Sequence, residues 1–206
     1  MRRYIASGVA VLVLGVLGSL AAKPLPKKPV APAPAPTPAA PVNDKVICLE
    51  AESGKITPPV TLYQSPDCSG GSAIEVKEGV NPKVKEGEAT PILSGDCVIH
   101  FKVLRAGMYQ FYARAWWLDG CGNSFYITFD DGPRMTISDG QYKSWHWVRG
   151  PKVRLEAGTH TLKFANSEDG ARLDQVFLTC DVDPRTGESV PVPVGKWKVT
   201  PWALVK

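Results

Sequence analysis

The stretch Tyr109-Gln110-Phe111-Tyr112-Ala113-Arg114-Ala115 decides the fold class. Its core-type side chains stand at every second position, which is the period of a half-buried β-strand. The same alternation recurs over residues 97–103, 125–129 and 160–164. Turn signals separate these runs: Ala106-Gly107, Asp131-Gly132-Pro133, Asp139-Gly140 and Ala157-Gly158. No helical period follows residue 46, so the sequence predicts an all-β chain folded as an antiparallel β-sandwich or jelly roll.

The charge balance argues against a nucleic-acid partner. The chain has 24 Lys and Arg against 20 Asp and Glu, but five of the basic residues and one acidic residue precede position 45. Residues 45–206 therefore carry nineteen charges of each sign and are neutral. Because nucleic-acid binding requires clustered basic charge, we expect no nucleic-acid partner.

Residues 1–22 have the pattern of a signal peptide or N-terminal anchor. Arg2 and Arg3 precede an uncharged apolar run over residues 5–22, and Ser19-Leu20-Ala21 fits a small-x-small cleavage site. The run is also close to the shortest length that spans a bilayer, about 17–25 residues, so a retained membrane tether is the alternative to cleavage. Both alternatives predict export to a secreted or cell-surface location, periplasmic or extracellular.

Residues 23–44 contain eight prolines interleaved with alanine. This composition favours extended polyproline II, which spans roughly 70 Å at 3.1 Å per residue. We expect a spacer that holds the domain at 45–181 away from a membrane or wall; an unstructured leader without a role is the alternative. In the tail, residues 182–206, Trp197 and Trp202 either dock on the domain or a partner, or lie in a loose segment.

Several segments in a fixed order carry a family resemblance. Cys48-Leu49-Glu50-Ala51-Glu52-Ser53 comes first, followed by the small-residue turn Ser69-Gly70-Gly71 and the strand Gly107-Met108-Tyr109-Gln110-Phe111-Tyr112-Ala113-Arg114. The later segments are Asn123-Ser124-Phe125-Tyr126 with Asp130-Asp131-Gly132, Trp145-His146-Trp147-Val148, residues 155–162 and residues 168–178. Together they resemble the carbohydrate-binding modules of families 6 and 35, over residues 46–181. The resemblance implies a galactose-binding-like β-sandwich.

The resemblance also implies a structural calcium ion. In such modules, acids on the first strand meet the aspartate of the last strand, and here those positions are Glu50, Glu52 and Asp174. A hard cation with oxygen ligands would neutralise three converging carboxylates, whose mutual repulsion would otherwise raise their pKa values. Three exposed surface acids are the alternative.

The five cysteines are an odd number, so at least one is free or pairs with another chain. Their connectivity does not follow from sequence alone. The strand pairing that the resemblance implies would suit a disulfide between Cys48 and Cys180. Cys68 and Cys97 would then form the second pair, and Cys121 would remain for a covalent dimer.

Sugar-binding modules hold their ligands with aromatic faces and a few polar groups. The resemblance places the cleft in loops at one edge of the sandwich, where Trp145 fits the family's loop-borne tryptophan best. The candidate ligand contacts are Trp145, Trp116, Trp117, Tyr142, Asn123, Asp119 and Arg172. For each aromatic residue, packing in the core or across strands is the alternative.

The chain departs from the family pattern at two places. Ser72, Ala73 and Ile74 follow the small-residue turn, where sugar-binding family 6 members usually have an aromatic residue. Arg172 stands where many members have asparagine, and it would either pair with an acidic sugar or seal the edge of the sheet. The fold therefore carries over from the family better than the ligand site does.

Catalysis has no constellation of residues to support it. The three histidines, His100, His146 and His160, fall in predicted strands at spacings that give no metal motif, and neither a nucleophile elbow nor a phosphate loop is present. We therefore expect a non-enzymatic protein. The first hypothesis is an exported carbohydrate-binding module that recognises a polysaccharide or cell-surface glycan. The alternative is a structural or adhesive surface protein that uses the same sandwich for protein–protein contacts.

Overall fold

The structure is a computed structural model that describes residues 43–82, 94–183, 185–189 and 192–205. The signal or anchor at 1–22 and residues 23–42 of the linker predicted over 23–44 lie outside the described residues. Within the described part of the chain, no helix is long and apolar enough to cross a membrane.

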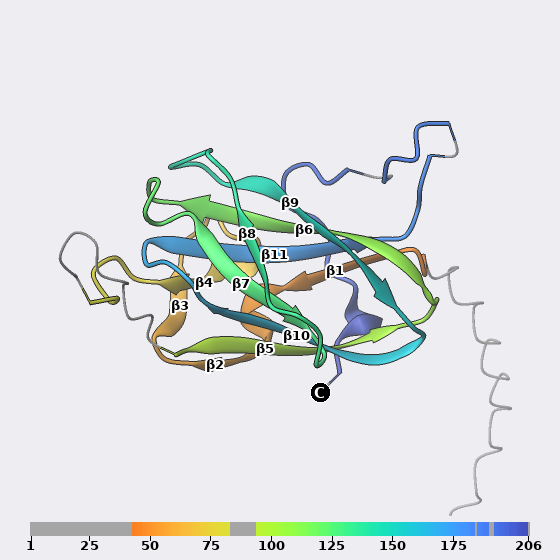
Figure 1. Cartoon of the computed structure of the whole chain (residues 1–206), viewed down its shortest axis with the longest axis horizontal. Helices are drawn as coiled ribbons and strands as arrows, with labels where there is room; N and C mark the ends of the chain where they lie inside the picture. The colour runs from red at the N-terminus through yellow and green to blue at the C-terminus, as the bar shows by residue number, and fades with distance from the viewer. Residues whose placement is uncertain (1–42, 83–93, 184, 190–191, 206) are drawn as a thin grey trace, which may run out of the picture. The chain divides into compact units, whose positions relative to one another are not determined.

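Two antiparallel sheets face each other across the core (Figure 1). The larger sheet has the order β3-β4-β11-β6-β9, with β1 also paired to β11. Its strands are β1 (Val46–Glu50), β3 (Val60–Gln64), β4 (Ser72–Val76), β6 (Gly107–Trp117), β9 (His146–Leu155) and β11 (Ala171–Thr179). The smaller sheet has the order β2-β5-β10-β7-β8. Its strands are β2 (Lys55–Thr57), β5 (Asp96–Val103), β7 (Ser124–Phe129), β8 (Met135–Ser138) and β10 (Gly158–Asn166). Three short 3₁₀ turns, η1 (Ala51–Ser53), η2 (Ser69–Gly71) and η3 (Pro201–Ala203), complete the described elements. The predicted all-β sandwich is confirmed.

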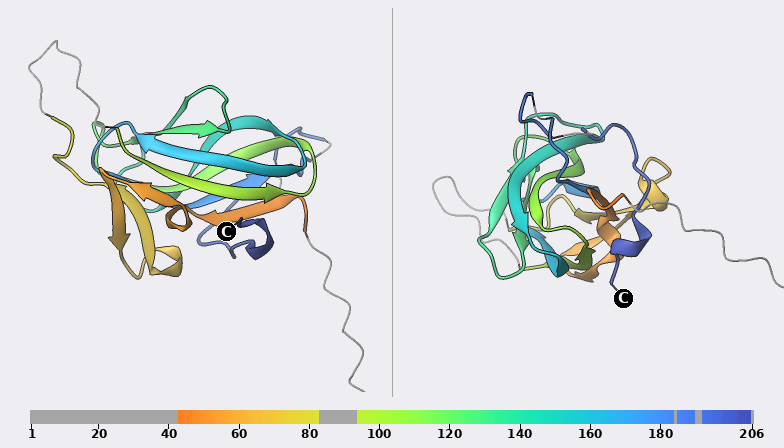
Figure 2. Two further views of the ribbon diagram at one scale, coloured as in Figure 1. Left: turned by 90° about the horizontal axis from the view of Figure 1, so that it is seen from below. Right: turned by 90° about the vertical axis from the view of Figure 1, so that its right-hand side faces the viewer.

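The core forms where the inner faces of the two sheets meet (Figure 2). Alternate residues of each strand point inward, as the period of two predicted. The largest fully buried side chains are Trp117, Tyr109, Phe101, Phe111, Phe125, Phe164 and Phe177. All of these except Phe177 belong to the inter-sheet cluster. Burial of each such ring stabilises the fold by about 1.5–3 kcal/mol.

A β-bulge at Asp174 changes which residues of β11 face the core. The register of β11 against β6 shifts between Leu173 and Gln175, so Asp174 is the extra residue of the bulge. Before the bulge, Arg172 points away from the core and Leu173 points into it. After the bulge, Gln175 and Phe177 point outward, because one inserted residue reverses the alternation. We call this outward surface of the larger sheet the outer face.

The predicted disulfides Cys48–Cys180 and Cys68–Cys97 are wrong, because all five cysteines are free. The bulge explains the first error. Cys48 lies opposite Phe177 in an apolar cluster on the outer face, whereas Cys180 packs against the inter-sheet core. Cys97 lies in the core, where its thiol donates a hydrogen bond to the carbonyl of Ala51 at 3.1 Å. Burial raises the pKa of Cys97 and of Cys48 to about 12, which makes both thiols poor nucleophiles.

The tail packs on the sandwich and is not a loose segment. Trp197 contacts Phe177 with ring centroids 4.5 Å apart, and Trp202 packs against the inter-sheet core. Leu204 forms a bridge with Phe101 of β5, and the amide of Val205 donates to His100 O at 3.1 Å. Figure 2 shows this segment running beside β1. The question that the sequence left open is therefore answered in favour of docking on the domain.

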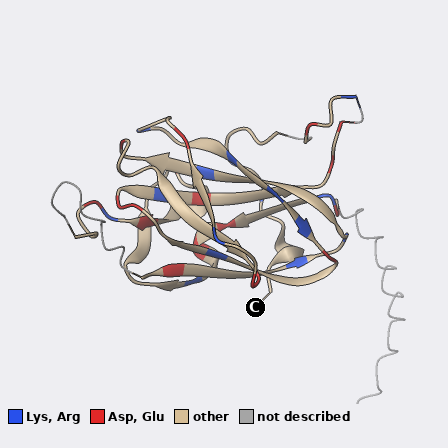
Figure 3. Cartoon of the chain, in the orientation of Figure 1, with Lys and Arg blue, Asp and Glu red and all other residues tan. Residues whose placement is uncertain are grey.

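Basic and acidic residues are interspersed over the described strands and loops (Figure 3). Several of them form ion pairs of opposite sign, such as Lys163 with Asp96 and Lys45 with Asp181. This mixed distribution agrees with the neutral charge balance of residues 45–206.

Candidate functional site

Glu50, Glu52 and Asp174 form a carboxylate cluster on the outer face. One carboxylate oxygen from each lies within 4.8 Å of the others. The pairing of β1 with β11 sets this arrangement, because Glu50 stands opposite Gln175 beside the bulge. Glu52 comes from turn η1 and not from the first strand, where the family resemblance had placed it together with Glu50. The three acids therefore converge as predicted and are not separate surface groups.

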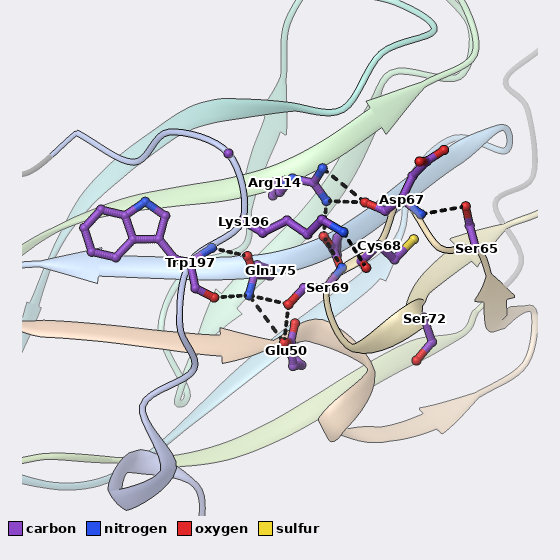
Figure 4. Close-up of polar contacts among 12 residues, drawn as sticks. Glu50, Ser65, Asp67, Cys68, Ser69, Ser72, Arg114, Gln175, Lys196 and Trp197 are labelled. Carbon is purple, nitrogen blue, oxygen red and sulfur yellow. Dashed lines mark hydrogen bonds and ion pairs between the residues drawn. The ribbon is translucent and has the colours of Figure 1, made fainter.

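One oxygen of each glutamate in the cluster, and both oxygens of Asp174, accept hydrogen bonds. Figure 4 shows the contact between Glu50 and Ser69. Ser69 Oγ donates to Glu50 Oε1 at 2.6 Å, and Ser72 Oγ donates to Glu52 Oε1 at 3.1 Å. The amide of Ser69 donates to both oxygens of Asp174, which also forms an ion pair with Arg114. Turn η2 thus supplies the donor to Glu50 and to Asp174, and the first residue of β4 supplies the donor to Glu52.

The second oxygens of the two glutamates are left without partners. Glu50 Oε2 and Glu52 Oε2 are buried and have no hydrogen bond among the described residues. A buried polar atom without a partner is costly. The cluster therefore fits an oxygen-liganded cation such as Ca²⁺, which would bind these oxygens and offset their charge.

Burial raises the pKa of all three carboxyl groups. The pKa of Glu52 rises to about 7, chiefly through burial, and the charges of Glu50 and Asp174 also contribute. For Asp174, the Ser69 amide and the Arg114 guanidinium oppose the effect of burial. In the metal-free protein, these groups bind protons more tightly when folded than when unfolded.

This difference predicts that the metal-free protein loses stability as pH rises from about 4.5, the ordinary pKa of a glutamic acid, to about 7. One pKa unit on one carboxyl corresponds to about 1.4 kcal/mol, reduced here by solvent screening. Since 1 kcal/mol shifts Tm by about 2–4 °C in a chain of this size, we expect a Tm a few degrees higher at pH 5 than at pH 7.5 in chelator. Thermal unfolding measures this. The Glu52→Gln variant should have a flatter profile, and an unchanged slope would contradict the account.

Three aromatic side chains and an arginine lie at the loop end of the outer face. Tyr63, Trp116, Trp145 and Arg172 are all half-buried, and we call them the aromatic–arginine row. Arg172 is opposite Trp116 in the β11–β6 pair, and Trp145 directly precedes β9 on the other side of Trp116. The guanidinium of Arg172 lies between two rings, 4.0 Å from the centroid of Tyr63 and 4.2 Å from that of Trp116.

Acidic groups and a small cavity border the row. Arg172 Nε donates to Glu75 Oε2 at 3.3 Å, and its Nη groups have no hydrogen-bonding partner within the described residues. A cavity of about 60 Å³ lies beside Trp116 and Arg172, with Glu78, Leu118 and Gly170 in its wall. The row thus combines half-buried aromatic rings with guanidinium donors that have no other partner among the described residues, which is a combination that can fix a polar ring-shaped ligand.

Trp145 and Trp116 belong to the row, but Trp117 does not. Trp117 is fully buried in the inter-sheet core, and its Nε1 donates to Asp139 Oδ1 at 3.0 Å. Its ring is therefore not available as a platform. The alternation of β6 explains the difference, because two successive residues of a strand point to opposite faces. One face of Trp145 is covered by the Arg114 guanidinium, 5.0 Å from its centroid.

The polar candidates shape the loops instead of lining the row. Asn123 Nδ2 donates to the carbonyl of Asp139 at 2.6 Å, and Asp119 accepts the amide of Cys121 at 2.9 Å. Asp139 also accepts from Trp117, so it ties the loop that carries Trp145 to the end of β6. Tyr142 is 42% exposed at the tip of that loop. Its role as a ligand contact stays a prediction.

Tyr63 and Glu75 are the members of this site that sequence reasoning missed. Tyr63 follows Thr61 at a two-residue spacing in β3, so the alternation Val60-Thr61-Leu62-Tyr63 placed it on the outer face. Tyr63 also supplies an aromatic ring near the small-residue turn, although from the strand before the turn and not after it.

Comparison with known proteins supports the fold. No protein-family model and no curated protein sequence matches the chain. Among solved structures, the chain is similar to the GH26-CBM35 β-(1,4)-mannanase of Podospora anserina, with a TM-score of 0.53 and 17% identity, over 68% of this chain and 29% of that enzyme. It is similar to the isomalto-dextranase of Arthrobacter globiformis T6 complexed with panose, with a TM-score of 0.51 and 15% identity, over 67% of this chain and 24% of that one.

A family 35 carbohydrate-binding module from Clostridium thermocellum also matches, with a TM-score of 0.47 and 17% identity, over 64% of this chain and 97% of the module. The chain spans less than a third of the two enzymes, so it corresponds to a part of each. At these identities the first two likenesses establish a shared β-sandwich fold. The resemblance to family 6 and family 35 modules, drawn from the sequence motifs, is in keeping with this fold.

Proposed function

We propose that this protein is an exported, non-catalytic carbohydrate-binding module that recognises a polysaccharide or cell-surface glycan. The aromatic–arginine row is the observation that carries the proposal. It presents half-exposed rings at the loop end of a rigid sheet, and the strands fix their spacing. The sandwich fold that the chain shares with parts of two glycan-processing enzymes adds support.

The row would bind a sugar by stacking and hydrogen bonding. One face of each ring of Trp116, Trp145 and Tyr63 lies against an arginine, and the ring surface that stays exposed would stack on the C–H face of a pyranose. The Nη groups of Arg172 would donate to ring hydroxyls or to the carboxylate of an acidic sugar. Because Tyr63 and Trp116 hold the guanidinium on both faces, little side-chain entropy is lost on binding. The mechanism needs no bond making or breaking.

The carboxylate cluster would hold a structural Ca²⁺ in this account. Glu50, Glu52 and Asp174 supply three converging carboxylates, and each glutamate has one oxygen that is otherwise unpaired among the described residues. Bound Ca²⁺ would cross-link β1, η1 and β11 and so stabilise the fold. Arg172 of the aromatic–arginine row lies on the same strand, β11, as Asp174, so a cation would also stiffen the support of that arginine.

A polysaccharide and glycan panel tests the function. The full chain is screened with calcium and with chelator, and both neutral and uronic-acid polymers are included. We expect retention on a defined glycan, weakened by Trp145→Ala. Tyr126→Ala is a matched control, because Tyr126 also packs under an arginine, Arg134 at 4.1 Å, but on the smaller sheet. If protein that is shown to be folded binds none of the glycans in a broad panel, the sugar-binding proposal is rejected.

An adhesive or structural role is the second candidate, and the exposed thiol of Cys121 favours it. Cys121 lies at the tip of the loop after β6 and would link two copies covalently. A dimer on non-reducing gels that disappears in Cys121→Ser would support this role. Glycan retention that is unchanged by Cys121→Ser would support the first proposal.

A further inference from the structure

Residues 195–205 at the end of the tail form a strap that covers part of the outer face at Trp197, follows the edge of β1 at Thr200 and ends against β5 at Leu204. The strap is anchored at several backbone positions. Trp147 Nε1 donates to the carbonyl of Gly195 at 2.8 Å. Further along, the amide of Thr200 donates to Cys48 O at 2.8 Å, and the amide of Cys48 donates to Thr200 Oγ1 at 2.9 Å. These bonds add the strap to the free edge of β1, the strand that ends in Glu50.

Gln175 joins the strap to the carboxylate cluster (Figure 4). On the strap side, Gln175 Oε1 accepts the amide of Trp197 at 2.9 Å, and its Nε2 donates to the carbonyl of Trp197 at 2.8 Å. On the cluster side, the same Nε2 donates to Ser69 Oγ at 2.9 Å and lies 3.3 Å from Glu50 Oε1. Gln175 is fully buried, so its amide cannot exchange these partners for water.

Lys196 contacts the turn that holds the cluster. Its Nζ donates to the carbonyls of Pro66 and Cys68, at 3.1 and 3.2 Å. Cys68 directly precedes Ser69, whose amide and hydroxyl bind two of the three acids. A displaced strap would therefore release both Gln175 and the turn that positions the carboxylates.

Apolar packing stabilises the docked strap. The ring of Trp197 covers Phe177, and together with Val46, Cys48, Tyr112 and Trp147 they form an apolar cluster separate from the inter-sheet core. Without the strap this cluster would face water. The strap is thus a folded part of the domain. Among the described residues, its only links to the carboxylate cluster run through Gln175, Lys196 and the edge of β1.

We propose that docking of the strap and binding of a cation at the carboxylate cluster are positively coupled. This inference rests on the cation site proposed above. A bound cation would fix the carboxylate of Glu50. Glu50 and Ser69 in turn fix the side-chain amide of Gln175, and this amide holds the backbone of Trp197. Coupling of two equilibria is reciprocal. If a bound cation raises the equilibrium constant for strap docking by some factor, a docked strap raises the affinity for the cation by the same factor.

Calcium titration calorimetry on the full chain measures one side of the coupling, with Ca²⁺ alone as the probe. Trp197→Ala loosens the strap without changing any residue of the carboxylate cluster. We expect it to weaken Ca²⁺ binding about tenfold. Gln175→Leu should weaken it by a similar factor. Lys198→Met is the matched control and should leave affinity unchanged, because Lys198 is exposed and forms none of the strap contacts above.

Amide hydrogen exchange measures the other side. Exchange of the Trp197 and Thr200 amides should be about tenfold slower in calcium than in chelator, whereas the amide of Asp130, bonded to Thr161 O on the other sheet, should change less. Equal or tighter Ca²⁺ binding in Trp197→Ala, or equal protection in calcium and chelator, would overturn the coupling while leaving the cation site standing. Absence of Ca²⁺ binding by the unmodified chain would overturn both.

Discussion

Arg114→Met is expected to destabilise the metal-free protein by about 3 kcal/mol, the cost of leaving one partner of a buried ion pair alone. Arg114 is 7% exposed and Asp174 is fully buried, and no other side-chain cation contacts Asp174 among the described residues. The methionine would fill most of the volume of the arginine, so the change tests charge more than packing. Arg114 also bonds the carbonyl of Asp67 and covers Trp145, and both contacts would be lost.

Thermal unfolding in chelator measures this effect, and a loss of this size lowers Tm by about 6–12 °C in a chain of this length. Arg134→Met is the control, because Arg134 is exposed and stacks on Tyr126 without a buried carboxylate. Added calcium should recover part of the loss in Arg114→Met, since the cation would take over the neutralisation of Asp174. A Tm within 1 °C of the unmodified chain would show that Asp174 does not depend on Arg114.

Trp116→Ala is expected to weaken glycan binding about thirtyfold, corresponding to roughly 2 kcal/mol. The change removes a stacking surface and also uncovers one face of Arg172, whose guanidinium lies 4.2 Å from the ring. Both effects act on the same ligand, so the loss should exceed that of Trp145→Ala, in which Arg172 keeps both of its rings.

Affinity electrophoresis or calorimetry with the best-retained glycan measures the loss, and circular dichroism checks that the variant is folded. Tyr126→Ala should bind as well as the unmodified chain, because its cation–π pair lies on the smaller sheet. If a folded Trp116→Ala binds with unchanged affinity, the aromatic–arginine row is not the glycan site.

The period of two along the sequence was enough to predict the strands. The runs at 97–103, 109–115, 125–129 and 160–164 lie within β5, β6, β7 and β10. The four turn signals all fall between strands or at their first residues. Local patterns succeed here because alternation and turn chemistry are properties of neighbouring residues.

The contacts that the sequence did not predict depend on one bulge and on long-range packing. The inserted residue at Asp174 reverses the facing of the rest of β11, which separates Cys48 from Cys180 and turns Gln175 toward the strap. No local sequence pattern predicts a bulge of this kind. Likewise, Trp197 docks on Phe177 because several outward apolar residues gather there only after the sheet has formed. The convergence of Glu50, Glu52 and Asp174 was predicted, but only through the family resemblance.

The central claim, that the aromatic–arginine row binds the glycan, is tested most directly by following its side chains during a ligand titration. Two-dimensional ¹H–¹⁵N NMR resolves the indole Nε1–H of each of the six tryptophans and the Nε–H of Arg172. The account predicts shifts at Trp116, Trp145 and Arg172, with little change at Trp117 in the core, at Trp147 beneath the strap or at Trp197 in the strap. Shifts confined to Trp147 and Trp197, or a bound glycan that moves none of the indole signals, would contradict it.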